Sequence, residues 1–326
     1  MRILLWHVHG SWMTAFVQGG HDYLVPVLPD RGPDGLGRAR TWDWPSSVTE
    51  LPPAALRDQD IDAVVLQRPH ELELAANWLG RRPGYELPAV YLEHNTPDAA
   101  PCTQRHLLAD RRDIPLVHVS HFNELFWDNG RAPTTVIEHG IVDPGVRYTG
   151  ELGRAAVVVN EPARRGRIVG ADLVRRFLPV APVDVFGMQA RAFADPLTRA
   201  AGLPPDRLVG YDQIDTQDRM HTELARRRVY LHLTRWTSLG LTLIEAMQLA
   251  MPVLTVASTE AVVAVPPAAG AISTDVRQLV HRLRELLAEP EQARACGLAA
   301  RAAALQRYGL KRFLTDWDVL LDGLIR

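Results

Sequence analysis

The feature that most constrains the fold is an alternation of short apolar runs with amphipathic, helix-like segments, which occurs twice along the chain. Such runs are typical of buried parallel strands, and the segments between them are typical of connecting helices. The apolar runs of the first series are 3–8, 23–28, 63–66, 89–93, 116–120 and 136–138, and those of the second are 155–159, 183–186, 208–209, 229–234 and 253–256. We therefore predict an α/β protein with two Rossmann-like, doubly wound parallel-sheet domains facing across a cleft, where ligands bind at the carboxyl ends of the strands.

The domain boundaries follow from a turn-rich polar stretch at residues 145–153 and a helical pattern from residue 273 onward. We expect a first domain at 1–148, a second at 149–306, and a C-terminal helix at 307–326 that packs back on the first domain. At 326 residues the chain is long enough for two domains of about 150 residues each.

A loop rich in Gly, Pro and Arg at residues 30–45 interrupts the first series. We interpret it as an ordered surface excursion in which Trp42 and Trp44 are partly buried. A contact with an acceptor or with a membrane is the alternative interpretation.

The basic residues are almost all arginine, with 35 Arg and one Lys, Lys311. This imbalance excludes a P-loop, which needs a lysine in its phosphate site, and a pyridoxal phosphate enzyme, which needs a lysine amine for its Schiff base. The net charge of -2 gives no global attraction to nucleic acid or anionic lipid, so we expect no nucleic-acid partner.

The expected location is cytoplasmic, with at most a peripheral contact at the inner face of the membrane. Cys102 and Cys296 lie far apart without a CxxC motif, which favours a reducing compartment. No apolar stretch approaches the length of about 18 residues that a membrane span needs, and the first apolar run is too short for a signal peptide.

The segment with the clearest chemical meaning is VYLHLTRWTSLGLTLIEAMQLAMPVLTVAS, residues 229–258. It predicts a buried strand, a tight turn at Ser238-Leu239-Gly240, and a helix that begins at Leu241. Backbone N–H groups and the positive end of the helix dipole at a strand exit form a phosphate site that needs no lysine. Glu245, just over one turn into the helix, suits the diol of a nucleotide ribose; a solvated surface glutamate is the alternative.

This segment resembles the C-terminal signature of the family-4 retaining glycosyltransferases (glycosyl transferases group 1), which have the GT-B fold. Gly240, Leu241, Glu245, Ala246, Met247, Pro252 and Val253 fall in register with it. The stretches YLEHNTP (91–97), LVHVSHFNELFWDNG (116–130), VIEHGIVDP (136–144) and LLAEPEQARACGLAARAAA (286–304) resemble further family stretches in the expected order.

The resemblance implies roles for particular residues. Glu245 would hold the ribose hydroxyls, and the turn from Ser238 through Leu239 and Gly240 to Leu241 would hold the diphosphate. His94 would meet the donor sugar from the first domain. The resemblance also implies that the first domain is the acceptor side and the second domain the donor side.

Two departures from the family pattern affect the site. Where the family has a basic loop ending in Lys-Gly, this chain has VVVNEPARRGRIVG, so Arg164 or Arg165 takes the place of the lysine as the diphosphate cation; a solvated turn is the alternative. Thr237 occupies the position of the first of the family's paired glutamates. Its hydroxyl can exchange one hydrogen bond but offers no carboxylate to the sugar.

The N-terminal stretch HVHGSW follows the first predicted strand. His7 and His9 would share one face of that strand, but no third metal ligand is placed by spacing, so we predict no metal site. His9, Gly10 and Ser11 would line an acceptor or phosphate loop at the start of the next helix; an ordinary strand-to-helix turn is the alternative.

Together these features predict a retaining, metal-independent glycosyltransferase without a cofactor, whose co-substrate is a UDP-, GDP-, ADP- or TDP-sugar. Retention is implied by the resemblance alone. The acceptor is a glycan, a lipid or a small molecule. A sugar-nucleotide epimerase of the GT-B type and a catalytically silent partner subunit that binds a nucleotide sugar are the alternatives.

Overall fold

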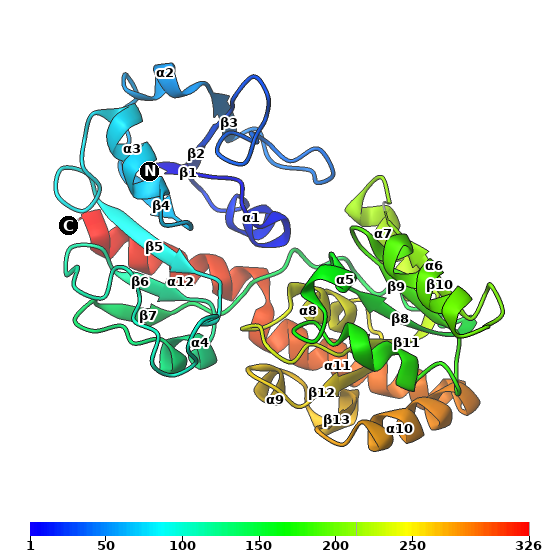
Figure 1. Ribbon diagram of the computed structural model, residues 1–326. Coiled ribbons are helices and arrows are strands. Elements are labelled where there is room, and N and C mark those ends of the chain that lie inside the picture. Colours follow the sequence, from blue (N-terminus) through cyan, green and yellow to red (C-terminus); the bar gives the residue numbers. More distant parts are fainter. Residues whose placement is uncertain (213, 326) are drawn as a thin grey trace. The chain divides into compact units, whose positions relative to one another are not determined.

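The computed structural model describes residues 1–212 and 214–325 of the chain. These residues form two compact units (Figure 1). Unit 1 comprises Met1–Val142 and the C-terminal segment that begins at Tyr308, and unit 2 comprises Asp143–Arg307.

Unit 1 is built on a parallel sheet of seven strands in the order β3-β2-β1-β4-β5-β6-β7, within the part of the chain that the structure describes. The strands are β1 (Arg2–Leu5), β2 (Asp22–Pro26), β3 (Val48–Leu51), β4 (Ala63–Leu66), β5 (Ala89–Glu93), β6 (Leu116–His118) and β7 (Thr134–Val136). The helices are α1 (Gly10–Phe16), α2 (Pro53–Leu56), α3 (Glu71–Leu79), α4 (His121–Phe126) and α12 (Leu310–Ile325).

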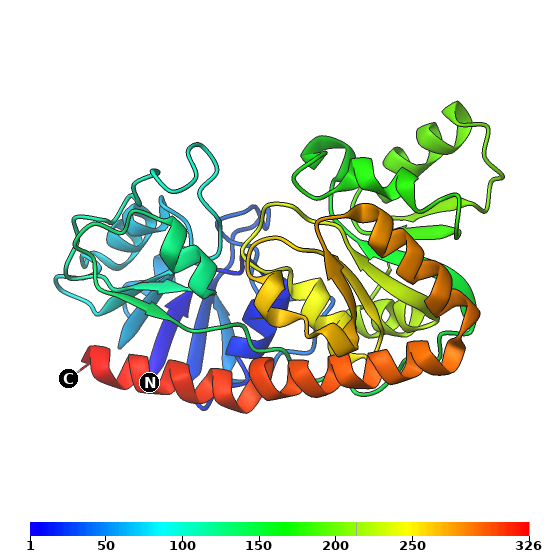
Figure 2. The same ribbon diagram turned by 90° about the horizontal axis from the view of Figure 1, so that it is seen from below.

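Helix α12 comes from the far end of the sequence and packs against α1 (Figure 2). Aromatic rings form this contact, because Trp317 of α12 lies with its ring centroid 5.6 Å from that of Trp12 and 5.0 Å from that of Phe16. All three side chains are almost completely buried. The hydrophobic effect thus ties the C-terminal helix to unit 1.

Unit 2 contains a second parallel sheet, six strands in the order β10-β9-β8-β11-β12-β13 among the described residues. The strands are β8 (Leu152–Val158), β9 (Val183–Phe186), β10 (Leu208–Tyr211), β11 (Arg227–His232), β12 (Val253–Val256) and β13 (Gly270–Ser273). The helices are α5 (Pro162–Arg165), η1 (Ala171–Arg176), α6 (Ala190–Ala200), α7 (Gln217–Ala225), α8 (Leu241–Gln248), α9 (Ala261–Ala264), η2 (Pro267–Ala269), α10 (Val276–Ala288) and α11 (Pro290–Tyr308), η marking 3-10 helices.

The core of unit 2 shows why its helices form where they do. Leu279, Leu283 and Leu286 recur at helical spacing along α10 and are fully buried against the sheet. The strands are mostly buried and apolar, as in a parallel sheet covered by helices, although Asp184 of β9 is buried and pairs with Arg154 of β8 and Arg227 of β11. The prediction of two Rossmann-like parallel sheets with a helical C-terminus is confirmed.

Each sheet has one point at which the strand order reverses direction. In unit 1 it lies between the neighbours β1 and β4, and in unit 2 between the neighbours β8 and β11. In doubly wound sheets the loops that follow two such strands lead to opposite sides of the sheet and leave a crevice between them. The carboxyl ends of the two strands are therefore the usual ligand site of such sheets. The loops that follow β1, β4, β8 and β11 are therefore the expected ligand-binding loops.

Several strand predictions need correction. The first strand ends at Leu5, not at residue 8, because the side-chain amide of Gln67 hydrogen-bonds to the carbonyl of Trp6 in place of a neighbouring strand. His7 and His9 therefore do not share a strand face. The last strand of unit 1 is β7, residues 134–136 rather than 136–138.

Two strands were not predicted at all. β3 reads VTEL and β13 reads GAIS, and in each only the first residue is buried. Both are edge strands. They pair through backbone hydrogen bonds with β2 and β12, and such pairing leaves little trace in the hydrophobic pattern.

Candidate functional site

The start of helix α8 forms one side of the reversal point of unit 2. β11 ends at His232, and the chain then reaches Gly240, which precedes α8 without any side-chain cap on the helix. A Cβ added at Gly240 would lie 2.6 Å from Cε1 of the buried His232 ring, so glycine is needed for the loop to pass over that ring. Gly240 has no side chain to cap α8, and the positive end of the helix dipole at this point suits an anionic ligand.

The neighbouring residues of this loop differ in exposure. Ser238 and Leu239 are buried, whereas Thr237 and Leu241 are partly exposed. The carbonyl of Ser238 accepts a hydrogen bond from the N–H of Glu260, which helps to fix the turn. Of the side chains predicted here, only those of Thr237 and Leu241 are thus partly open to solvent.

The two arginines after β8 have different surroundings. Arg164 forms two hydrogen bonds with the carboxylate of Glu161, at 3.0 and 2.5 Å, and is exposed. Arg165 is half-buried, and burial together with the neighbouring charge of Arg164 lowers the pKa of its guanidinium from the usual value. Glu161 also attracts Arg165 but is hydrogen-bonded to Arg164, so the half-buried Arg165 gains more from a bound diphosphate than the paired, exposed Arg164.

The loops after β8 and β11 are joined directly. The carbonyl of Ile168 accepts hydrogen bonds from the N–H groups of Arg235 and Trp236, at 2.8 and 3.3 Å. The guanidinium of Arg235 also donates to both carboxylate oxygens of Asp172, at 2.6 and 2.9 Å. These contacts bring the turn that carries Arg165 and the loop that carries Thr237 side by side.

Glu245 lies on α8 with its side chain almost completely buried. Its Oε2 accepts a hydrogen bond from Nε2 of Gln217 at 3.0 Å, and Nε2 of His221 lies 3.4 Å away. Both partners come from α7. Gln217 and His221 were not predicted from the sequence, because their only signal there is a spacing of four residues on one helix face, which does not indicate the helix that they meet.

In unit 1 three histidines converge at the carboxyl ends of the strands. The His9 and His94 ring centroids are 4.0 Å apart, and His139, which follows β7, lies 6.3 Å from His94. Gln67, which follows β4, accepts a hydrogen bond from Nε2 of His94 at 3.1 Å. His9 and His94 were predicted from the sequence, whereas His139 and Gln67 were not, since only the sheet order brings the four separate loops together.

Burial determines the charge of these histidines. It lowers the pKa of His9 to about 4, with a further contribution from Arg68, and lowers the pKa of His139 to about 3. The pKa of His94 is also held well below its usual value by burial and by its two histidine neighbours. At neutral pH the cluster is uncharged, so these three rings supply no positive charge.

The remaining predicted residues of this loop lie at the start of α1. His9 precedes the helix, and Gly10 and Ser11 are its first two residues, all three of them partly exposed. A Cβ on Gly10 would lie 3.1 Å from the indole nitrogen of Trp42, so the helix start packs closely against the loop of residues 30–45.

The His7 and His9 rings have separate partners. Nδ1 of His7 hydrogen-bonds with the carbonyl of Gly37, whereas the His9 ring faces His94. Within residues 1–212 and 214–325, no group of three or more His, Cys, Asp or Glu side chains is placed to hold a metal ion. Among the same residues no helix has both the length and the apolar character of a membrane span.

The comparisons with known proteins agree with this architecture. A protein-family model described as glycosyl transferases group 1 matches residues 205–303, which include α7, α8 and Glu245. Sucrose-phosphate synthase from Thermosynechococcus elongatus has the same fold, with a TM-score of 0.74, 14% identity and 99% of each chain covered. The fold is GT-B.

Other GT-B structures are similar over their full length. The Anabaena protein HepE in complex with UDP-glucose gives a TM-score of 0.68 at 15% identity, covering 99% of this chain and 100% of its own. A glycosyltransferase from Rickettsia africae gives 0.69 at 11% identity, covering 100% and 98%. No curated protein sequence matches the chain.

Proposed function

We propose that the protein is a glycosyltransferase that moves a sugar from a nucleoside diphosphate donor to an acceptor hydroxyl. The observation that carries the proposal is the match of glycosyl transferases group 1 to residues 205–303, the segment that contains the start of α8 and Glu245. The joined loops at the β8–β11 reversal point support it, because such a point is where doubly wound sheets bind nucleotides.

Each group at this point has a role in the proposed reaction. Glu245 accepts hydrogen bonds from the ribose hydroxyls, and the first-turn N–H groups of α8 with Arg165 stabilise the negative charge that grows on the departing diphosphate. The bond between the anomeric carbon and the diphosphate oxygen breaks, and a bond to the acceptor oxygen forms. The proton of the acceptor hydroxyl passes to the leaving diphosphate, so no separate base is assigned.

The finer features of the reaction belong to the same proposal. We infer retention of the anomeric configuration, because the sequence resembles retaining enzymes, and a reaction that needs no metal, because helix N–H groups and Arg165 can meet the charge. Neutral His94 would accept or donate a hydrogen bond to the donor sugar. NMR of the product anomer tests retention, and an inverted product would contradict it; loss of transfer on adding EDTA would contradict the metal-free step.

The decisive experiment is calorimetric titration with UDP, GDP, ADP and TDP. UDP and UDP-glucose are the first probes, because HepE forms complexes with both. We expect one nucleotide to bind, and Glu245→Gln to weaken that binding by about 10- to 100-fold, since hydrogen bonds to a charged group contribute about 1.5–3 kcal/mol.

Glu291→Gln is the matched control, because Glu291 is an exposed glutamate on α11 of the same unit. It should bind the nucleotide as the wild type does. Absence of binding by all four nucleotides, or an unchanged affinity in Glu245→Gln, would overturn the proposal.

Thr237 favours a second candidate function, a catalytically silent subunit that binds a nucleotide sugar. Its side chain offers a hydroxyl where the related family has a carboxylate. A protein that binds the nucleotide sugar but transfers no sugar to any acceptor would support this second function, and gain of transfer in Thr237→Glu would identify the missing group. An isomerised free nucleotide sugar among the products would instead indicate an epimerase.

A further inference from the structure

A cavity of about 500 Å³ in unit 1 adjoins the predicted loop of His9, Gly10 and Ser11 through Gly10, and the other residues that line it have no role so far. It is formed by the loop of residues 30–45 and the chain just before α1, and its lining includes His7, Arg31, Arg38, Arg40 and Trp42. The volume is in the range of sites that bind small molecules. The lining contains three guanidinium groups and no carboxylate.

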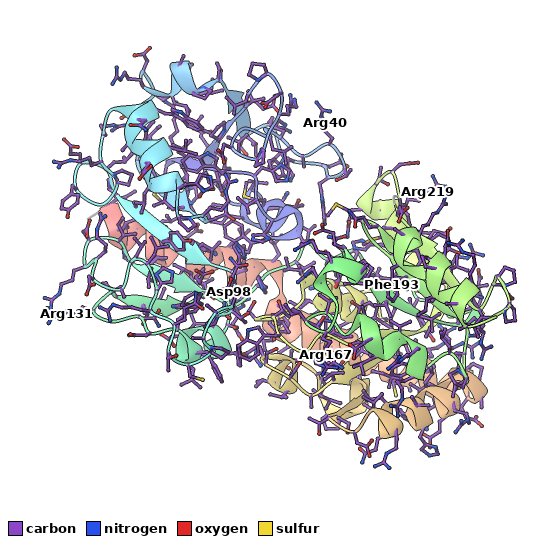
Figure 3. All side chains as sticks on the ribbon, viewed as in Figure 1. Arg40, Asp98, Arg131, Arg167, Phe193 and Arg219 are labelled. Carbon is purple, nitrogen blue, oxygen red and sulfur yellow. The ribbon has the colours of Figure 1, made fainter. Side chains whose placement is uncertain are left out.

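The three arginines are held differently. Arg31 donates two hydrogen bonds to Glu50, at 2.9 and 3.0 Å, which balances its charge. The guanidinium of Arg38 donates to main-chain carbonyls, among them that of Trp44 at 2.6 Å. Arg40 is exposed on the loop (Figure 3), and its guanidinium has no partner among residues 1–212 and 214–325.

The acidic groups of this loop do not compensate the excess charge. Asp34 pairs with Arg68 and His70, at 3.1 and 2.8 Å. Asp30 and Asp43 are exposed and are not part of the lining. Burial lowers the pKa of His7, so that ring is neutral at pH 7. The cavity therefore has a net positive charge, carried by Arg38 and Arg40.

An aromatic surface lies beside these charges. The Trp42 indole is partly exposed, and the missing side chain of Gly10 lets its nitrogen approach the start of α1. Thr41, also in the lining, adds an exposed hydroxyl. An aromatic face next to free guanidinium and hydroxyl donors matches a sugar ring that carries an oxyanion.

We propose that this cavity binds an anionic acceptor, a sugar whose phosphate or carboxylate group pairs with Arg40 while its ring packs on Trp42. Phosphate and carboxylate share the planar, bidentate hydrogen-bonding pattern that a guanidinium recognises. The assignment as an acceptor site rests on the proposed glycosyltransferase function.

The first test measures binding without any nucleotide, by calorimetry with glucose 6-phosphate, glucuronic acid and glucose. We expect at least one of the two anionic sugars to bind tenfold or more tightly than glucose, and Arg40→Gln to remove that difference. Whichever anionic sugar binds more tightly shows whether the cavity recognises a phosphate or a carboxylate group. Equal binding of all three sugars, or an unchanged preference in Arg40→Gln, would overturn the proposal.

Arg131→Gln is the matched control, because Arg131 is an exposed arginine of unit 1 far from Arg40 (Figure 3). It should keep the preference for the anionic sugar. Trp42→Leu separates the two contacts: it should weaken binding of the anionic sugar but leave inorganic phosphate binding within twofold. Weakened phosphate binding in Trp42→Leu at an unchanged melting temperature would contradict the role of the ring.

The second test links the cavity to transfer and separates this proposal from the proposed function. In Arg40→Gln we expect the KM for the anionic acceptor to rise tenfold or more, while UDP binding stays that of the wild type. If UDP binding depends on Glu245 but the KM for the anionic acceptor is unchanged in Arg40→Gln, the acceptor site is overturned. The proposed function then still stands. Failure of every nucleotide to bind would overturn both, even if the anionic sugar still bound.

Discussion

At the scale of single residues, Gly240 is an informative position, because its constraint is steric and not conformational. Its φ of −71° is accessible to any residue, yet an added Cβ would meet the His232 ring at 2.6 Å. We expect Gly240→Ala to lower the free energy of unfolding by about 1–3 kcal/mol through overpacking, and to weaken nucleotide binding by displacing the start of α8. Urea denaturation and calorimetry measure the two effects.

Gly153→Ala is the control for that prediction, since Gly153 lies on β8 with open space around its Cβ position. Its stability should stay within about 0.5 kcal/mol of the wild type. Replacing His232 by alanine in the Gly240→Ala background should restore part of the lost affinity. If the double variant binds nucleotide no better than Gly240→Ala, the contact with the ring does not explain the glycine.

At the scale of elements, the loops after β8 and β11 are fixed to one another by Arg235 and Asp172. The Arg235 guanidinium holds the pKa of Asp172 below its usual value, as expected for a bidentate pair. We expect Asp172→Asn to reduce nucleotide affinity about three- to tenfold, because the Arg165 turn and the Thr237 loop lose their relative position. The stability loss should stay near 1 kcal/mol, because both side chains are partly exposed.

The matched control is another arginine–carboxylate pair of the same unit, Glu151 with Arg226, at the opposite end of β8. Glu151→Gln should leave nucleotide affinity unchanged. An equal loss of affinity in both variants would show that the effect is general and does not come from the joined loops.

At the scale of the whole molecule, the buried histidines of unit 1 couple stability to pH. The pKa values of His9 and His139 in the folded protein, about 4 and about 3, lie below the value of 6.5 that they regain on unfolding. Between pH 6.5 and 4 the unfolded chain therefore binds more protons. The free energy of unfolding should fall as the pH is lowered, by up to about 1.4 kcal/mol per pH unit for each such histidine.

Denaturation series at pH 7, 6 and 5 test this coupling. In His139→Gln the free energy of unfolding should fall less steeply as the pH is lowered, because up to about one proton fewer is taken up on unfolding. This holds whatever the effect of the substitution on stability at pH 7. His281→Gln is the control, because His281 is exposed on α10. A slope unchanged by His139→Gln would contradict the assignment of His139 as a buried neutral group.

The sequence predicted most strands and helices of both sheets, because a parallel strand buried on both faces leaves a strong apolar run and its crossover helix an amphipathic pattern. It did not predict the edge strands β3 and β13, because these strands are held by backbone hydrogen bonds and have no run of buried apolar residues. The start of α8 was also predicted correctly, since strand, glycine turn and helix are local features.

The sequence by itself thus determined the fold class and the start of α8, because these depend on residue type and short-range spacing, and it predicted an arginine-based phosphate site. Only the tertiary structure decided which loops meet. Strand order placed β8 beside β11, the fold brought α7 to Glu245, and three neutral histidines from separate loops came together in unit 1. Such contacts join residues far apart in the chain, and their energy depends on burial and geometry that no local pattern encodes.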